Sequence, residues 1–175
     1  MRNEYENVSI VVAFVGIGAV LHAVIPGFFF GMKPDMMLTM MFLAIMLFPN
    51  KTAVSLLAIA TGIISGVTTS FPGGFIPNVV DKVVTATLFF GLFTLLKAKA
   101  TPVKAALLTA VGTFISGATF LAVALAVVGL PGGATFGGLF VAVVIPTAFV
   151  NTIAMIVIYP IVQSLMRRTY TVPQQ

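Results

Sequence analysis

Two pairs of opposite charges stand where helices are expected to begin in an otherwise apolar chain. Lys33 and Asp35 flank a proline, and Asp81 is followed directly by Lys82. The amino end of a helix attracts a carboxylate through its free N–H groups, and a lysine adds a positive point charge. A nearby aspartate can receive an ammonium group. We expect two such helix starts, facing each other, to form a receptor for a zwitterion such as an amino acid.

A purely structural role for some of these residues stays open. Asn78 precedes Asp81 by three residues, a spacing that resembles a capping box in the first turn of a helix. Asp35 could cap a helix in the same way. We keep Asn78 and both aspartates as candidate substrate contacts beside this alternative.

Aromatic residues gather near the same charges. They are Phe28, Phe29, Phe30, Phe71 and Phe75. A hydrophobic cleft lined by rings and a few polar groups is the usual make-up of a small-molecule site. We therefore predict that this group contacts substrate, whereas most of the chain's 16 phenylalanines face lipid or pack helices.

Two further polar residues lie inside apolar segments. His22 stands late in the first segment, and Asn151 shares one face of the last segment with Thr147 and Tyr159. Such side chains either hydrogen-bond a neighbouring helix or contact a ligand. Both alternatives stay open, and we keep His22 and Asn151 as candidate substrate contacts.

The composition excludes several kinds of chemistry. The chain has no cysteine and one histidine, which excludes thiolate and His-rich metal sites. It also lacks a nucleophile with a partner base and a Gly-x4-Gly-Lys-Ser/Thr loop for ATP. We therefore expect no enzyme activity, no metal and no cofactor, and any ATPase must be another subunit.

These residues must be positioned by helices in a lipid bilayer. Hydrophobic residues make up 59% of the 175 residues and charged residues 7%, with a mean hydropathy of +1.16, whereas soluble domains carry about 25% charged residues. Apolar runs predict an all-α integral membrane protein, a single domain over 1–175 with membrane lipid around it. Its six transmembrane helices are expected at 8–25, 35–48, 52–70, 79–96, 103–130 and 140–166.

Basic residues predict the orientation of these helices. With the N-terminus in the cytoplasm, the inner side holds Arg2, Lys51, Lys97, Lys99, Lys104, Arg167 and Arg168, and the outer side holds Lys33 and at most Lys82. This asymmetry follows the positive-inside rule. Both termini are therefore expected to be cytoplasmic, and the net charge of +5 is attributed to topology rather than to a nucleic-acid partner.

The second predicted helix is short for a membrane. From Met36 to Phe48 it has 13 residues, or about 20 Å, against a hydrocarbon core of about 30 Å. If it ends near the inner headgroups, its charged start lies at membrane depth. Such a start is tolerated only beside protein or a cavity, which predicts a pocket on the outer side.

Small residues mark two helix-contact faces. One face consists of Ala58, Gly62, Gly66 and Ser70, and the other, in the first helix, consists of Gly16, Ala19 and Ala23. Each face could pack within the chain or dock another membrane protein.

The chain resembles the bacterial tryptophan-transport protein family TrpP. The likeness begins with HAVIPGFFFGMKPDMMLTMMFLAIMLFP from His22 and continues in FPGGFIPNVVDK from Phe71, VGLPGG from Val128 and NTIAMIVIYPIVQSLMRR from Asn151. The resemblance implies uptake of L-tryptophan across the bacterial cell membrane.

That family belongs with the substrate-binding S components of energy-coupling-factor transporters. The resemblance implies an S-component-like bundle whose partners are a transmembrane coupling subunit and ATPases. It also implies that loops 28–35, 71–78 and 131–138 cover and line the site, and that a face of small residues on the first helix docks the coupling subunit. That face is formed either by Ala19 with Ala23 or by Ala13 with Gly16.

Two other functions stay open. A stand-alone, proton-coupled secondary transporter would need no ATPase and would give His22 or Asp81 a titrating role. A non-transporting membrane scaffold would show no saturable ligand binding.

Overall fold

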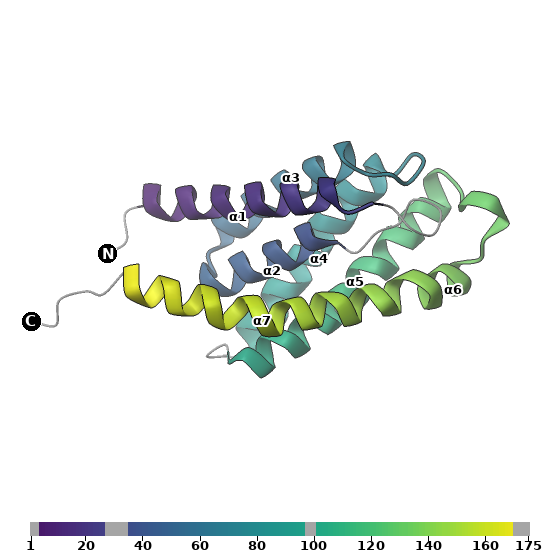
Figure 1. The fold of residues 1–175 in the computed structure, drawn as a ribbon. Helices are drawn as coiled ribbons and strands as arrows, with labels where there is room; N and C mark the ends of the chain where they lie inside the picture. Colours follow the sequence, from purple (N-terminus) through teal and green to yellow (C-terminus); the bar gives the residue numbers. More distant parts are fainter. Residues whose placement is uncertain (1–3, 27–34, 97–100, 170–175) are drawn as a thin grey trace, which may run out of the picture.

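A computed structural model describes residues 4–26, 35–96 and 101–169, and these are almost entirely helical (Figure 1). The elements are α1 (Glu4–Val24), α2 (Met36–Leu47), α3 (Lys51–Val67), α4 (Phe75–Leu95), α5 (Pro102–Val127), the 3-10 turn η2 (Pro131–Gly133), the short α6 (Phe136–Leu139), the π-helical turn η3 (Phe140–Val144) and α7 (Ile145–Thr169). No strand occurs within the described ranges. The all-α class predicted from the sequence is confirmed.

Each apolar segment of the sequence forms a helix. Within the described residues, three helices are long and apolar enough to cross a bilayer, at Phe75–Leu95, Pro102–Val127 and Phe136–Met166. The apolar helices Val11–Val24, Met36–Leu47 and Lys51–Val67 are shorter. The prediction of six complete crossings therefore stays a prediction.

Three helical stretches begin about one turn earlier than the sequence predicts, the first of them at Glu4 rather than at 8. The fourth begins at Phe75 rather than at 79, because a proline such as Pro77 is tolerated in the first helical turn. The last helical stretch begins at Phe136 rather than at 140, where Thr135 accepts a hydrogen bond from the N–H of Gly138. The last two shifts add a turn of helix at the same end of the bundle.

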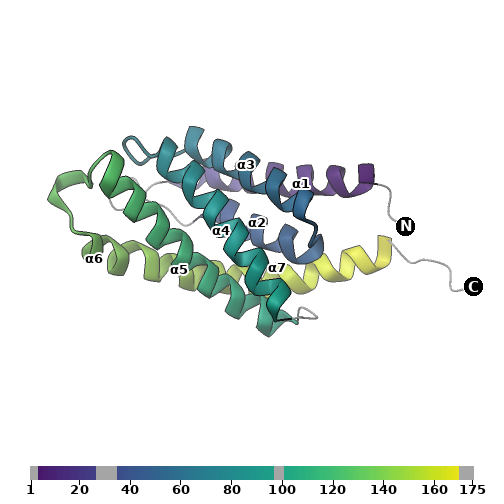
Figure 2. The ribbon, with the colours of Figure 1, turned by 180° about the vertical axis from the view of Figure 1, so that it is seen from behind.

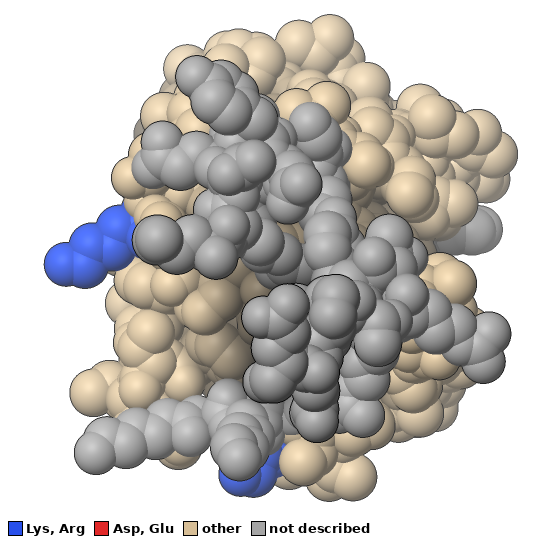
Figure 3. All heavy atoms as spheres, turned by 90° about the vertical axis from the view of Figure 1, so that its left-hand side faces the viewer, with Lys and Arg blue, Asp and Glu red and all other residues tan. Residues whose placement is uncertain are grey.

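The two ends of the bundle differ in what they carry. α1 begins and α7 ends at one end, and α3 and α5 begin toward it, whereas α4 begins at the other end and α2 begins inside the bundle (Figures 1 and 2). We call the first the basic end, because the exposed Lys51 and Lys104 lie at the starts of α3 and α5. Figure 3 looks onto the basic end and shows basic but no acidic side chains among the described residues in view.

The short α2 lies at the centre of the bundle. It contacts α1, α3, α4, α5 and α7, and every residue from Met36 to Met46 is buried. A helix that is apolar on all sides is buried on all sides, and MMLTMMFLAIML fits that description. Its 12 residues span only about 18 Å, so its amino end stops inside the bundle.

The two small-residue faces have different surroundings. On α3, a Cβ at Gly62 would lie 3.1 Å from the backbone of Val79, and one at Gly66 would meet the ring of Phe75. Gly62 and Gly66 therefore pack inside the chain, against α4, whereas Ser70 lies beyond the end of α3 and is exposed. On α1, Ala13, Gly16 and Ala23 are exposed and Ala19 is partly exposed.

Gly112 of α5 allows close packing against two stacked rings. Phe42 and Phe89 have ring centroids 4.0 Å apart, and a Cβ at Gly112 would lie 2.5 Å from the first ring and 2.9 Å from the second. Both rings are 0% exposed, so they have no free space to move into. We expect Gly112→Ala to lower the free energy of unfolding by about 1–3 kcal/mol through overpacking.

The thermal unfolding midpoint of the purified protein in detergent measures this effect. Gly91→Ala is the matched control, because it also places a methyl group on a helical glycine and meets nothing within 4 Å. Equal midpoints for the two variants would contradict the packing described here.

Candidate functional site

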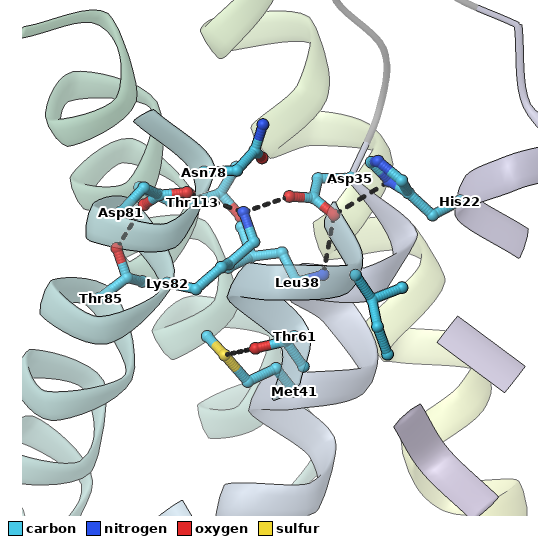
Figure 4. A network of polar contacts seen from close by, with 12 residues as sticks. His22, Asp35, Leu38, Met41, Thr61, Asn78, Asp81, Lys82, Thr85 and Thr113 are labelled. Atoms are coloured by element: carbon cyan, nitrogen blue, oxygen red, sulfur yellow. Dashed lines mark hydrogen bonds and ion pairs between the residues drawn. The ribbon is translucent and has the colours of Figure 1, made fainter. Parts of the chain in front are cut away.

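A charged cluster lies between the start of α2 and the second turn of α4, and Figure 4 shows its members pointing toward one another. The Nζ of Lys82 lies 2.5 Å from Oδ2 of Asp35 and 2.7 Å from Oδ2 of Asp81. The Nδ1 of His22, from α1, lies 3.4 Å from Oδ1 of Asp35. The side chains of Lys82 and Asp81 are each 1% exposed. Charges this deeply buried need a partner or a cavity.

Asp35 combines a capping role with an ion pair. Its Oδ1 accepts a hydrogen bond from the N–H of Leu38 at 3.0 Å, which caps α2. Its other oxygen contacts Lys82. The capping alternative is therefore confirmed for Asp35, and capping leaves its second oxygen free for the charged cluster.

The capping-box alternative for Asn78 and Asp81 is wrong. Because α4 begins one turn earlier, both residues lie inside the helix rather than at its start. The Nδ2 of Asn78 donates to the carbonyl of Gly74 at 2.7 Å. Asp81 instead accepts hydrogen bonds from the hydroxyls of Thr85 and Ser116, each at 2.8 Å. Asp81 is thus tied to α5 as well as to its own helix.

A cavity of about 80 Å³ adjoins the cluster, with room for several water molecules. Its polar lining consists of His22, Asp35, Thr69, Asn78, Asp81, Lys82, Thr113, Ser116 and Thr147, and its other lining residues are Leu38, Phe71, Gly117, Phe120, Val143 and Val144. Charged anchors combined with aromatic and aliphatic walls are typical of small-molecule sites. The structure therefore brings five of the predicted polar contacts and one predicted ring to a single cavity: His22, Asp35, Asn78, Asp81, Lys82 and Phe71.

Among the described residues, two phenylalanine rings line the cavity. Phe71, from the connection between α3 and α4, meets Phe120 of α5 edge to face, with centroids 5.2 Å apart and planes at 83°. Phe75, which the sequence placed in the same group, is 46% exposed and does not line the cavity. The reason is its place at the start of α4, where it packs against Gly66 of α3.

The π-helical turn η3 supplies two aliphatic residues to the lining. Val143 and Val144 lie one turn before Pro146 and face the cavity. A proline has no N–H to donate to the carbonyl of Ala142, four residues earlier, and η3 lies at that point. Gly117 of α5 lets Val144 approach closely, because a Cβ there would collide with the valine side chain. π-helical turns are frequent at functional sites.

Asn151 lies behind the cavity rather than in its lining. Its Nδ2 donates to the hydroxyl of Thr113, which does line the cavity, at 3.3 Å. Asn151 is 0% exposed, and its Oδ1 has no hydrogen-bond partner among the described residues. It is thus placed to orient Thr113. The remaining predicted contacts lie outside the described residues: Phe28, Phe29, Phe30 and Lys33.

The contribution of α5 to the cavity lining was not predicted from the sequence. Thr113, Ser116, Gly117 and Phe120 all line the cavity, and none was singled out. Their spacing of three and four residues places them along one helical face. Polar residues on one face of an apolar helix are the signal that would have found them.

Comparisons with known proteins point to one family. The family model for the tryptophan transporter TrpP matches residues 4–167. A protein of Bacillus subtilis (strain 168), named as a probable tryptophan transport protein, is 56% identical over 164 residues, which cover 94% of each chain. Proteins with the same name from Clostridium acetobutylicum and Clostridium perfringens are 39% and 36% identical, over 95% and 96% of this chain and 97% of each relative. No solved structure matches the chain.

Proposed function

Because this chain belongs to the TrpP family of tryptophan transporters, we propose that it binds L-tryptophan in the cavity for uptake into the cell. The family likeness inferred from the sequence is confirmed, and the family consists of transporters rather than enzymes. The chain is a multi-pass membrane protein of the bacterial cell membrane.

The proposal is carried by one observation: a charged cluster and an aromatic pair share a single cavity. An amino acid offers an ammonium and a carboxylate, and tryptophan adds a flat apolar ring system. In our proposal Asp35 and Asp81 receive the ammonium, and the remaining N–H of Lys82 faces the carboxylate. Phe71 and Phe120 contact the indole, since aromatic rings pair favourably in edge-to-face and offset arrangements.

Residues of the connection between α1 and α2 would complete the site by covering the cavity. We propose on sequence grounds that Phe28, Phe29, Phe30 and Lys33 belong to a lid over the cavity. The basic end would face the cytoplasm, in accord with the positive-inside rule, so the cavity would open toward the outside.

We also propose that the chain acts as an S component, with a transmembrane coupling subunit and ATPases as partners. The chain has no P-loop of its own. The docking surface would be the face of α1 formed by Ala13, Gly16, Ala19 and Ala23, because small residues let membrane helices approach closely. These residues are exposed or partly exposed in this chain.

Gly16→Leu tests the docking role, because a Cβ at Gly16 meets nothing within 4 Å in this chain. We expect the variant to bind tryptophan normally. Uptake of labelled tryptophan by cells that carry the coupling module should fall at least about tenfold, through lost helix contact. Gly91→Leu, on α4 and equally free of contacts, should transport normally.

Reconstitution in liposomes tests the energy source. Uptake should require ATP and the coupling subunits, and an uncoupler that collapses the proton gradient should leave the rate unchanged. Uptake by the chain alone, driven by a proton gradient, would show a secondary transporter instead. Normal uptake by the Gly16→Leu variant would contradict the docking role proposed for this face of α1.

A further inference from the structure

The charged groups that line the cavity do not balance among the described residues. Asp35 and Asp81 contribute two carboxylates, whereas Lys82 contributes one ammonium. With His22 counted as neutral at pH 7, the lining carries one net negative charge. Lys33 lies outside the described residues and is not in this sum.

The net negative charge of the lining favours a positively charged ligand group, and the hydrogen bonds of the cluster favour one too. A lysine ammonium has three N–H donors, and Lys82 directs two of them to Asp35 and Asp81. An ionised carboxylate can accept about four hydrogen bonds. Asp81 accepts from Lys82, Thr85 and Ser116, so it keeps an acceptor position. The cavity therefore has more unused acceptors than unused cationic donors.

The acceptors of Asp35 are likewise incompletely used. It accepts from the N–H of Leu38 and contacts Lys82 and His22. Its side chain is 15% exposed, against 1% for Lys82. A ligand that enters the cavity can therefore reach this carboxylate more easily than the lysine.

We propose that the cavity recognises the ammonium group of its ligand first and therefore also binds arylethylamines, which have no carboxylate. Tryptamine is the arylethylamine that keeps the indole of tryptophan. The net negative lining attracts a positively charged group of the ligand and repels a carboxylate of the ligand. The proposal rests on the proposed function, since the same cavity takes tryptophan, and it assigns most of the recognition to Asp35 and Asp81.

Titration of three indoles into the purified full chain measures the contributions of the ammonium and of the carboxylate to binding separately. Tryptophan carries both charges, tryptamine only the ammonium and indole-3-propionate only the carboxylate. The chain has no Trp, so indole fluorescence reports each ligand directly. We expect the Kd of tryptamine to lie within about tenfold of that of tryptophan, and that of indole-3-propionate to be at least about a hundredfold weaker.

Asp35→Asn tests the role of the charge, because asparagine is also a good N-cap and keeps the start of α2 intact. Tryptamine affinity should fall at least about tenfold in this variant. Ser65→Ala is the control: Ser65 is 0% exposed on α3 but does not line the cavity, and its tryptamine affinity should match that of the wild type. Unchanged tryptamine affinity in Asp35→Asn would overturn the proposal.

The outcomes also separate this proposal from the proposed function. Saturable tryptophan binding with tryptamine at least about a hundredfold weaker overturns the ammonium-first recognition alone. Tryptamine binding without tryptophan binding supports it and contradicts the proposed function. Saturable binding of none of the three indoles contradicts both.

Discussion

Lys82→Met lowers the free energy of unfolding by about 3–5 kcal/mol, because removal of one partner leaves the other charges buried without compensation. Lys82 is the shared partner of Asp35 and Asp81, and Asp81 is 1% exposed. Methionine keeps the unbranched shape of the lysine stem, so lost packing contributes little. The thermal unfolding midpoint of the purified variant in detergent measures the effect.

Two further variants isolate the charge. Lys51→Met changes an exposed lysine at the start of α3 and should stay within about 0.5 kcal/mol of the wild type. Adding Asp35→Asn and Asp81→Asn to Lys82→Met removes all three charges of Lys82, Asp35 and Asp81 and should restore much of the lost stability. Equal midpoints for Lys82→Met and Lys51→Met would show that the cluster stabilises nothing.

Phe120→Ala weakens tryptophan binding by about tenfold to a hundredfold. Phe120 lines the cavity beside Phe71, and burial of an aromatic side chain contributes about 1.5–3 kcal/mol, where 1.4 kcal/mol corresponds to tenfold. Phe120 is only partly buried, so its loss should affect the ligand more than the fold. The Kd from tryptophan titration measures the change.

Phe114→Ala is the control on the same helix. Phe114 stacks on Phe140, with centroids 6.1 Å apart, and it does not line the cavity. Its variant should bind tryptophan as the wild type does. If both variants bind equally well, the indole does not lie against the ring of Phe120.

The buried charged cluster was predictable because a bilayer makes such charges costly, although Asp81 and Lys82 lie in the second turn of α4 rather than at its expected start. Few polar residues persist in apolar segments without a partner or a cavity, so His22, Asp35, Asp81 and Lys82 could be grouped before their positions were known. The start of α2 inside the bundle was predictable from its length, because 12 residues are too few to cross the hydrocarbon core. In both cases a strong local constraint left little choice.

Contacts between distant segments were not predictable. The bond from Ser116 to Asp81 joins residues 35 positions apart, and no local pattern specifies it. Phe75 was misplaced because a single residue's direction depends on where its helix begins, and the start of α4 was expected one turn too late. Pro77 does not prevent the earlier start, because the first turn of a helix accepts proline.

Tryptophan binding in the cavity is tested most directly by fluorescence titration of the purified wild-type chain. The protein contains no Trp and three Tyr, so excitation at the red edge of the indole band reports almost solely on the added amino acid. We predict a saturable, blue-shifted emission as the indole leaves water for the lining of Phe71 and Phe120. A signal that rises linearly and matches tryptophan in buffer would contradict binding.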